Sequence, residues 1–141
     1  MNLSKLKKLL ILGANGFLGK NVVKLVEEQY EYNLLQLRGK EELDLTKDNL
    51  FSEYLSKNQV DYVINCSAFV GGIAYGYDYP AELLSKNTMM ASHIYQACYE
   101  NKIELLVNPI SNCAYPKKQT LYEEENFWDG APHESVFEYG F

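Results

Sequence analysis

The sequence predicts an α/β fold with a Rossmann-type, doubly wound parallel sheet, and three observations lead to that prediction. Short apolar runs alternate along the chain with longer amphipathic segments, which is typical of β-α-β units. A glycine-rich turn joins the first apolar run to the first amphipathic segment. The fourth apolar run has no successor, so we expect a sheet that is truncated after its fourth strand.

Each element is predicted from its local pattern. Apolar runs predict four parallel strands, at residues 9–12, 33–37, 60–66 and 103–110. Amphipathic segments predict three helices between them, at residues 17–29, 48–57 and 81–101. We expect the first helix to turn four side chains inward, those of Val22, Val23, Leu25 and Val26. Thr46 and Asp48 are expected to cap the second helix, and residues 70–73 and 111–132 are expected to form irregular loops.

Composition excludes several classes of protein. The 141 residues carry a net charge of -6, and their basic residues are scattered, which argues against a nucleic-acid partner. No apolar run reaches the ~18 residues of a membrane span, and no cleavage site follows the first apolar run, so we expect a cytoplasmic protein without a membrane partner. Three widely spaced cysteines favour free thiols over a disulfide framework or a metal site.

The turn Gly13-x-x-Gly16-x-x-Gly19 predicts dinucleotide binding. The first glycine permits a tight turn, the second lets the backbone approach a pyrophosphate, and the third lets helix and strand pack closely. The helix that follows presents free N–H groups and a positive dipole end to the phosphates. A glycine turn in an unrelated α/β protein is the alternative.

Residues after the second strand predict which dinucleotide is bound. NAD-preferring enzymes place a carboxylate about 20 residues after the glycines, and this chain has none there. Arg38 and Lys40 could hold a 2′-phosphate, which favours NADP, with NAD as the alternative; both are otherwise solvated cations. Asp44 is placed to reach the adenine amine, or else serves as a turn residue before the helix.

Polar and small residues follow the third and fourth strands, at the sheet edge where parallel sheets bind ligands. Ser67 and Ala68 are small enough for the backbone to pass close to a cofactor, although they also suit an ordinary strand exit. Ser111 can hydrogen-bond a substrate hydroxyl or carbonyl group. Tyr139 is the candidate for the tyrosine that transfers a proton as hydride moves to or from a nicotinamide.

Several segments together resemble the extended short-chain dehydrogenase/reductase family of nucleotide-sugar epimerases and dehydratases. They are the glycine triplet and residues 37–45, 70–73, 79–87, 111–117 and 139–141. The resemblance implies an NADP-dependent nucleotide-sugar epimerase/reductase whose substrate is GDP-linked. It implies that Ser111 orients the substrate, Tyr139 is the general acid/base, and Cys113 serves in epimerisation. By its residue type alone Cys113 is equally a small buried hydrophobe.

The resemblance also implies a cofactor site and a dimer. The expected cofactor-binding residues are Gly13, Asn15, Gly16, Phe17, Leu18, Gly19, Arg38, Asp44, Leu45, Ser67, Ala68 and Asn87. Asn87 could instead be a satisfied interior polar group. Relatives dimerise through their long helix, so the resemblance implies a homodimer through the helix at residues 81–101.

The sequence departs from the family pattern at its end. The family motif Tyr-x-x-x-Lys requires a lysine four residues after Tyr139, and the printed chain ends at Phe141. That lysine lowers the pKa of the tyrosine. We therefore expect residues 1–141 to be an N-terminal dinucleotide-binding portion that lacks the substrate lobe and has negligible turnover. The alternatives are a non-catalytic NAD(P)-binding module or partner subunit, and a fragment from an interrupted reading frame.

Overall fold

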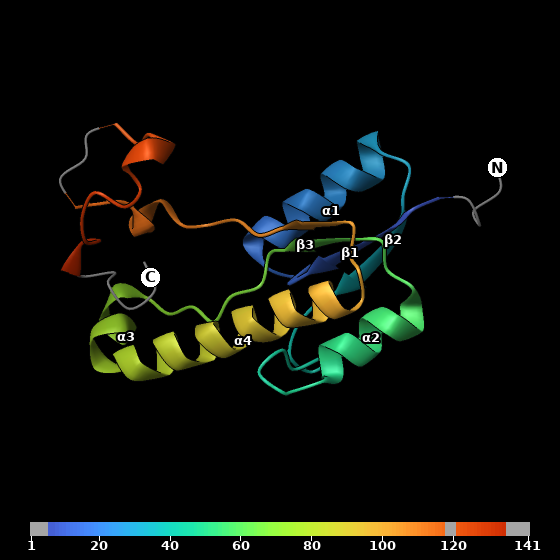
Figure 1. Ribbon diagram of the computed structural model, residues 1–141, viewed down its shortest axis with the longest axis horizontal. Coiled ribbons are helices and arrows are strands. Elements are labelled where there is room, and N and C mark those ends of the chain that lie inside the picture. Colours follow the sequence, from blue (N-terminus) through green and yellow to red (C-terminus); the bar gives the residue numbers. More distant parts are fainter. Residues whose placement is uncertain (1–5, 118–120, 135–141) are drawn as a thin grey trace. The chain divides into compact units, whose positions relative to one another are not determined.

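The computed structural model describes residues 6–117 and 121–134 of the chain (Figure 1). Its helices and strands are β1 (Lys8–Leu12), α1 (Phe17–Gln29), β2 (Asn33–Leu37), α2 (Leu50–Asn58), β3 (Tyr62–Asn65), α3 (Ile73–Asp78), α4 (Pro80–Glu100) and β4 (Leu105–Val107). Two turns of 3₁₀-helix follow, at Asn112–Ala114 and Glu124–Asn126. The described residues form two compact units, one from residues 6–68 with 89–109 and one from residues 69–88 with 110–117 and 121–134.

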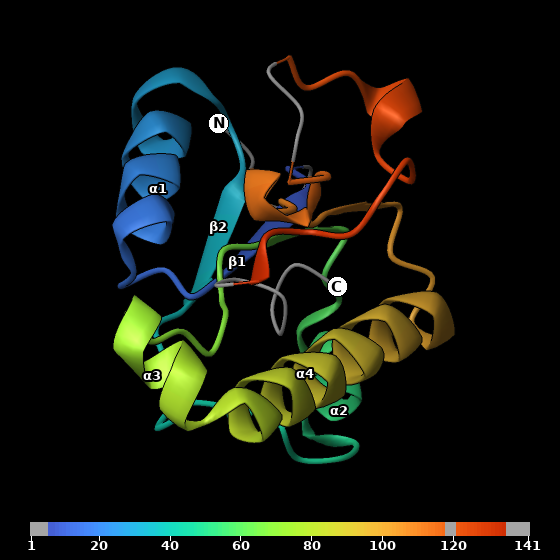
Figure 2. The ribbon, with the colours of Figure 1, turned by 90° about the vertical axis from the view of Figure 1, so that its left-hand side faces the viewer.

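The first unit contains a four-stranded sheet in which all neighbouring strands are parallel, as predicted. The strand order is β2-β1-β3-β4, so β1 is central and pairs Leu10 with Leu35 on one side and with Val63 on the other. Helix α1 lies on one face of the sheet, and α2 with the later part of α4 lies on the other (Figure 2). This is the doubly wound arrangement.

The alternation of side chains along β1 builds one hydrophobic core on each face of the sheet. Leu10 and Leu12 point to the face of α2 and α4, where they join a cluster that includes Phe51, Leu55, Val63, Ile94, Ala97 and Cys98. Leu9 and Ile11 point to the opposite face and pack with Val26 of α1. The central strand is therefore apolar on both sides, as a buried parallel strand should be.

Two local predictions about side chains are wrong. Leu25 is 45% exposed, because α1 packs on the sheet through Gly19, Val22, Val23 and Val26, and Leu25 falls outside that stripe. Thr46 and Asp48 do not cap α2, which begins at Leu50 after Asn49 in a left-handed conformation (φ 63°). The Thr46 hydroxyl instead donates to the Asp44 carboxylate at 2.7 Å.

The third and fourth strands are shorter than predicted, and one helix was not predicted. Strand β4 covers three residues, and Pro109 cannot extend its ladder because it has no N–H group. Helix α3 begins at Ile73, the last residue of the segment expected to be a loop, and continues through residues for which no element was predicted. Six residues are too few for a recognisable periodicity, and a contact with α4 supports the helix: the Tyr75 hydroxyl donates to Glu82 at 2.6 Å.

Asp61 links the strands at the amino-terminal edge of the sheet. Its Oδ2 accepts a hydrogen bond from the backbone N–H of Lys8 at 2.7 Å, and its Oδ1 lies 3.2 Å from Lys7 Nζ. Lys7 also pairs with Glu104, which precedes β4. The hydrogen bond from Lys8 is the main reason that the pKa of Asp61 lies below its usual value.

We therefore expect Asp61→Asn to lower the free energy of unfolding by about 1–2 kcal/mol at neutral pH. Because the folded-state pKa of Asp61 is lowered, its contribution is present above the unfolded-state pKa, about 3.9, and is lost as the pH falls through the folded-state pKa. Urea unfolding of both proteins between pH 7 and pH 3 measures this. The gap between them should narrow below about pH 4, and a constant gap would show that the charge of Asp61 is not the cause.

Candidate functional site

The glycine turn directly follows β1 and is held tightly by its surroundings. Gly13 adopts a left-handed conformation (φ 69°), which favours glycine. A Cβ atom at this position would lie 2.7 Å from the carbonyl oxygen of Cys66 and 2.8 Å from the backbone nitrogen of Ser67. The Cys66–Ser67 peptide after β3 thus passes across the Cα atom of Gly13, so both the conformation and the space require glycine.

Gly16 and Gly19 have different roles in the same turn. A Cβ atom on Gly19 would overlap the carbonyl oxygen of Gly13 and would lie 2.8 Å from Cα of Ala14, so Gly19 allows the helix to begin against the turn. Gly16 is exposed and is the N-cap residue of α1, and a Cβ there would lie 3.2 Å from the Gly13 oxygen. Its N–H donates to that oxygen at 2.9 Å, which closes the turn.

The amino terminus of α1 is open. No side chain caps it, and its first turn contains no acidic residue. Four of the predicted cofactor-binding residues, Asn15, Gly16, Phe17 and Leu18, are all exposed, and Phe17 is 92% exposed. The N–H groups of a helix start are donors without helical acceptors, so this end of α1 can accept an anion.

The strand order places this turn where doubly wound sheets bind ligands. With the order β2-β1-β3-β4, the chain leaves β1 toward one neighbour through α1 and reaches the other neighbour, β3, through α2 on the opposite face. Ligands bind in the crevice at the carboxyl ends of such a strand pair. The first unit thus brings together the glycine turn after β1 and the predicted residues Ser67 and Ala68 after β3.

Two asparagines that were not among the predicted site residues hold the exit of β3. Asn65 Oδ1 accepts hydrogen bonds from Ser67 N at 2.9 Å and from Ser67 Oγ at 2.5 Å. Asn65 Nδ2 donates to Asn108 Oδ1 at 2.7 Å. The only sequence signal for this pair is the presence of a polar residue at the end of each of two neighbouring apolar strands.

Arg38 follows β2 and is available to a ligand. Its side chain is 58% exposed, and its guanidinium Nη1 lies 3.6 Å from Glu42 Oε1 in a surface ion pair. Its backbone N–H donates to Glu42 Oε2 at 2.8 Å, which closes the turn after the strand. Lys40 is also exposed. The arrangement is compatible with phosphate binding and equally with a solvated ion pair.

Asp44 and Leu45 lie on the connection to α2. Asp44 Oδ1 accepts from Thr46 N at 3.0 Å as well as from the Thr46 hydroxyl, and the hydroxyl contact is the main reason that the pKa of Asp44 is lowered. Asp44 thus holds the turn before α2, and its predicted contact with the adenine amine stays a prediction. Leu45 is buried in the core on the α2 and α4 face, and its carbonyl oxygen lies 2.9 Å from His93 Nδ1.

Asn87 is a satisfied polar group in the second unit. Its Oδ1 accepts from the backbone N–H of Phe69 at 2.9 Å, and its Nδ2 donates to the carbonyl oxygen of Phe69 at 2.8 Å and to that of Leu83 at 3.0 Å. The side chain thus holds both backbone polar groups of the residue that follows Ala68. Its contacts indicate a positioning role and leave its predicted contact with a cofactor a prediction.

The second unit also contains Ser111 and Cys113. Ser111 is exposed, and its Oγ accepts from the backbone N–H of Cys113 at 3.1 Å, which leaves the hydroxyl hydrogen free to donate. Cys113 is half-buried, and its Sγ lies 3.7 Å from Asn112 Oδ1. Tyr115 packs against the rings of Tyr122 and Phe127. Tyr139 lies outside the described residues.

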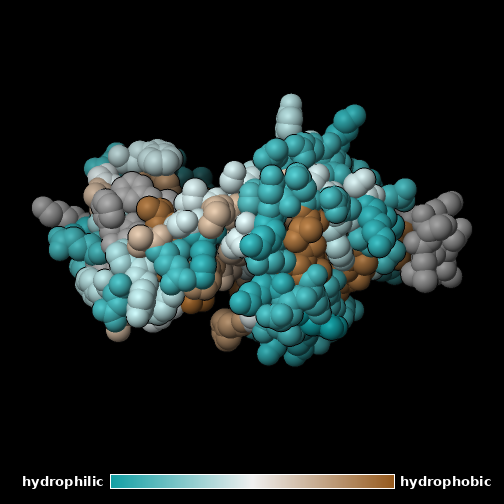
Figure 3. All heavy atoms as spheres, turned by 90° about the horizontal axis from the view of Figure 1, so that it is seen from below, coloured by the Kyte–Doolittle hydropathy of each residue, from teal (hydrophilic) through white to brown (hydrophobic). Residues whose placement is uncertain are grey.

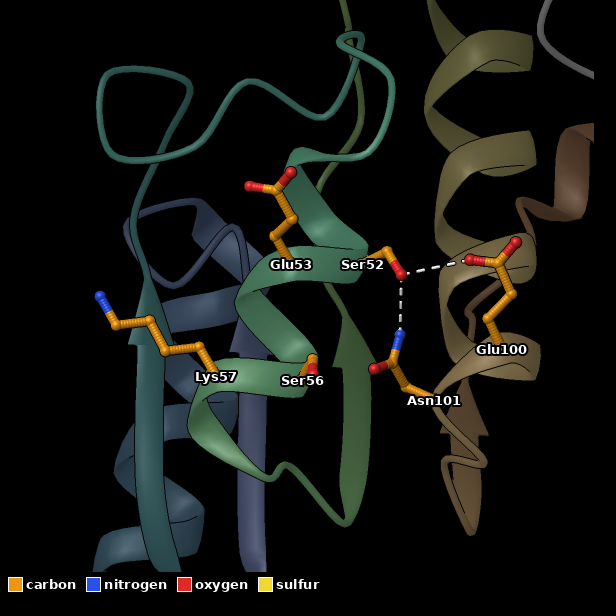
Figure 4. Close-up of a pocket in the computed structure, with 6 residues that line it drawn as sticks. All are labelled: Ser52, Glu53, Ser56, Lys57, Glu100 and Asn101. Carbon is orange, nitrogen blue, oxygen red and sulfur yellow. Dashed lines mark hydrogen bonds between the residues drawn. The ribbon is translucent and has the colours of Figure 1, made fainter.

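Away from the glycine turn, the first unit has one further depression of interest. A shallow depression is lined by Ser52, Glu53, Ser56, Lys57, Glu100 and Asn101, all polar (Figure 4). In the described part of the chain no group of three His, Cys, Asp or Glu side chains could hold a metal ion. Among the described residues, no helix is both long and apolar enough to cross a lipid bilayer.

Comparisons with known proteins match this architecture. Residues 9–140 match the model of the NAD dependent epimerase/dehydratase family. The chain is 31% identical over 121 residues to a GDP-L-fucose synthase of Escherichia coli and 32% identical over 110 residues to a GDP-L-colitose synthase of Yersinia pseudotuberculosis. These matches cover 84% and 78% of this chain but 37% and 35% of the relatives, so the chain spans little more than a third of their length.

A solved structure agrees with the sequence relatives. The crystal structure of a GDP-L-fucose synthetase from Naegleria fowleri bound to NADP superposes with a TM-score of 0.83 at 27% identity. The superposition covers 95% of this chain and 40% of that one. The fold, the glycine turn and the sequence similarity thus agree.

Proposed function

Because the chain belongs to the NAD dependent epimerase/dehydratase family, we propose that it is the dinucleotide-binding portion of an NADP-dependent nucleotide-sugar epimerase/reductase. The observation that carries the proposal is the glycine turn, whose Gly13 and Gly19 admit no Cβ and whose Gly16 leads into an uncapped helix. The relatives' names support a GDP-linked sugar as substrate class, and the NADP bound to the Naegleria structure supports the cofactor. A cytoplasmic location is part of the same proposal.

The residues present fit a dinucleotide. The N–H groups at the start of α1 would bind the pyrophosphate, and Gly16 leaves room for it where a side chain would stand. Arg38 would bind the 2′-phosphate, and the backbone at Ser67 and Ala68 would border the nicotinamide half. When bound, the dinucleotide supplies the hydride for reduction of a keto-sugar.

The catalytic roles are proposed for three residues of this chain. The Ser111 hydroxyl, exposed and with its hydrogen free, would donate to the substrate oxygen. Tyr139 would move the proton at that oxygen, and Cys113 would take or return a proton at a carbon beside the ketone. Residues 1–141 span little more than a third of the relatives' length, so we expect a polypeptide of these residues alone to bind the dinucleotide with negligible turnover.

An exposed helix face supports a homodimer. Tyr95 and Tyr99 of α4, which lie one helical turn apart, are 50% and 86% exposed. Figure 3 views the molecule from the side of α2 and α4, and apolar side chains appear there between polar ones. Exposed apolar side chains on one helix favour association. The same face would serve the alternative function, a non-catalytic NAD(P)-binding module or partner subunit.

The preference for NADP is tested by replacing Arg38. Arg38→Ala should weaken NADPH binding about tenfold while NADH binding stays within about twofold, because a guanidinium–phosphate contact exists only with NADPH. Isothermal titration of both cofactors measures this. Lys24→Ala is the matched control, since Lys24 is also an exposed cation paired with a glutamate four residues later. Equal weakening of both cofactors, or an equal effect of Lys24→Ala, would contradict the assignment of Arg38.

A further inference from the structure

We propose that Asn65 and Asn108 form an amide clasp that positions the Cys66–Ser67 peptide against the glycine turn, and that both are positioning residues for dinucleotide binding. The proposal rests on the proposed function for its ligand. Neither residue is assigned a role by the family resemblance. The clasp joins the carboxyl ends of β3 and β4, and its effect would reach the ligand through the backbone.

The hydrogen bonds of the clasp form a continuous chain. Asn108 follows β4, and its Oδ1 accepts a hydrogen bond from Asn65 Nδ2 at 2.7 Å. This bond orients the Asn65 amide so that its oxygen is directed toward Ser67. That oxygen accepts both the backbone N–H and the hydroxyl of Ser67. The backbone therefore turns as it leaves β3, and the amide plane of Asn65 fixes where it turns.

The turned backbone is the part of the chain that touches the glycine turn. The carbonyl oxygen of Cys66 and the nitrogen of Ser67 lie within 2.8 Å of the position that a Cβ atom of Gly13 would occupy. On the other side, Cys66 N donates to the Leu12 oxygen at 2.9 Å. Gly13 thus packs on a peptide whose position depends on Asn65.

The clasp side chains are partly buried, so their hydrogen bonds are protected from water. Asn65, Ser67 and Asn108 are all of intermediate exposure. Removing the Asn108 oxygen would leave the Asn65 donor without its partner and free the Asn65 amide to rotate. The Cys66–Ser67 peptide would then lose its fixed position beneath the turn, and the start of α1 would be less well ordered for a phosphate.

The test compares three replacements of Asn108 in the 141-residue chain. Asn108→Leu and Asn108→Ala remove the acceptor, and the smaller variant is used if leucine prevents folding. Asn108→Gln keeps an amide oxygen and should therefore retain most of the NADPH affinity of the unaltered chain. We expect the first two to raise the NADPH dissociation constant about tenfold in protein shown to be folded by its cooperative unfolding.

A second readout does not depend on NADPH. Cys66 is half-buried, and burial raises the pKa of its thiol, so alkylation by iodoacetamide should be slow. If the clasp holds the Cys66–Ser67 peptide bond, Asn108→Leu or Asn108→Ala should speed alkylation of Cys66 about fivefold or more. Mass spectrometry of the proteolytic fragment that contains Cys66 measures the rate. Cys98 is buried in the core, so its alkylation should stay slow in the unaltered chain and in the Asn108 variants.

Asn101→Leu is the matched control. Asn101 is also a partly buried asparagine, and its Nδ2 donates to Ser52 Oγ at 2.9 Å (Figure 4). The same nitrogen donates to the Ala97 oxygen at 2.9 Å. It follows α4 and precedes β4, so it lies at the opposite end of the strands from the glycine turn. Its loss should lower stability without changing NADPH affinity or Cys66 alkylation.

The outcomes separate the clasp from the proposed function. Folded Asn108→Leu or Asn108→Ala protein with unchanged NADPH affinity would overturn the clasp as a positioning device for the ligand. An effect of Asn101→Leu as large as theirs would overturn it too, because general loosening would then explain both. If the unaltered chain binds no NADPH, the proposed function fails. Independently of NADPH, an unchanged rate of Cys66 alkylation in Asn108→Leu or Asn108→Ala would show that the clasp does not hold the Cys66–Ser67 peptide bond.

Discussion

Replacing Gly19 with alanine is expected to lower the free energy of unfolding by about 3 kcal/mol, the upper part of the range for overpacked sites. The added Cβ would overlap the carbonyl oxygen of Gly13 and crowd Cα of Ala14, and both are backbone atoms that cannot move aside by a rotamer change. Relief requires α1 to move away from the glycine turn. Urea unfolding followed by circular dichroism measures the loss.

Gly39→Ala is the matched control for this experiment. A Cβ atom on Gly39 would meet no heavy atom within 4 Å, and the φ of Gly39 is not positive. Alanine there should leave stability unchanged or raise it by about 0.5 kcal/mol, since it restricts the unfolded chain. If Gly19→Ala were as stable as Gly39→Ala, close packing of α1 on the turn would be refuted.

Gly16→Asp is expected to abolish NADPH binding, with affinity reduced at least about 100-fold, while the chain stays folded. Gly16 is the N-cap residue of α1, and aspartate is a favoured N-cap that accepts helix N–H groups. The same carboxylate would occupy the space and the donors that a pyrophosphate needs, and its charge would repel the phosphates. The helix would thus keep its cap and lose its ligand.

Gly16→Asn separates charge from size in this experiment. Asparagine has nearly the shape of aspartate and is an equally good N-cap, but it is neutral. We expect it to weaken NADPH binding less than aspartate does, because the charge repulsion is removed while the occupied space and the occupied N–H donors remain. Calorimetric titration and thermal unfolding of both variants measure affinity and stability. Undiminished NADPH binding by folded Gly16→Asp protein would show that the dinucleotide does not use this turn.

The sequence predicted those parts of the fold that short-range patterns encode. Helix α1 begins at Phe17 and ends at Gln29 as expected, because its apolar stripe and its glycine start lie within consecutive residues. The length of strand β4 was overestimated, because it depends on pairing with β3, which a run of apolar residues does not reveal. Pro109 also prevents extension of the ladder. Helix α3 was missed because tertiary contacts support so short a helix.

The same distinction applies to the candidate site. The three glycines could be recognised from spacing, and the structure shows that Gly13 and Gly19 leave no room for a Cβ atom. The role of Gly16 toward a pyrophosphate stays a prediction. The contact between Asn65 and Asn108 joins residues 43 positions apart, and only the register of β3 on β4 creates it. Likewise, the double contact of Asn87 with the Phe69 backbone required the helix to be in place. The roles of Ser111, Cys113 and Tyr139 stay predictions.

Titration of the purified 141-residue chain with NADPH and with NADH by isothermal calorimetry tests the dinucleotide site most directly. We predict micromolar binding of NADPH and binding of NADH that is weaker by about tenfold, because the exposed guanidinium of Arg38 is proposed to bind the 2′-phosphate. A chain that unfolds cooperatively, and is therefore folded, yet binds neither dinucleotide would contradict the claim that the glycine turn and the start of α1 form a working cofactor site.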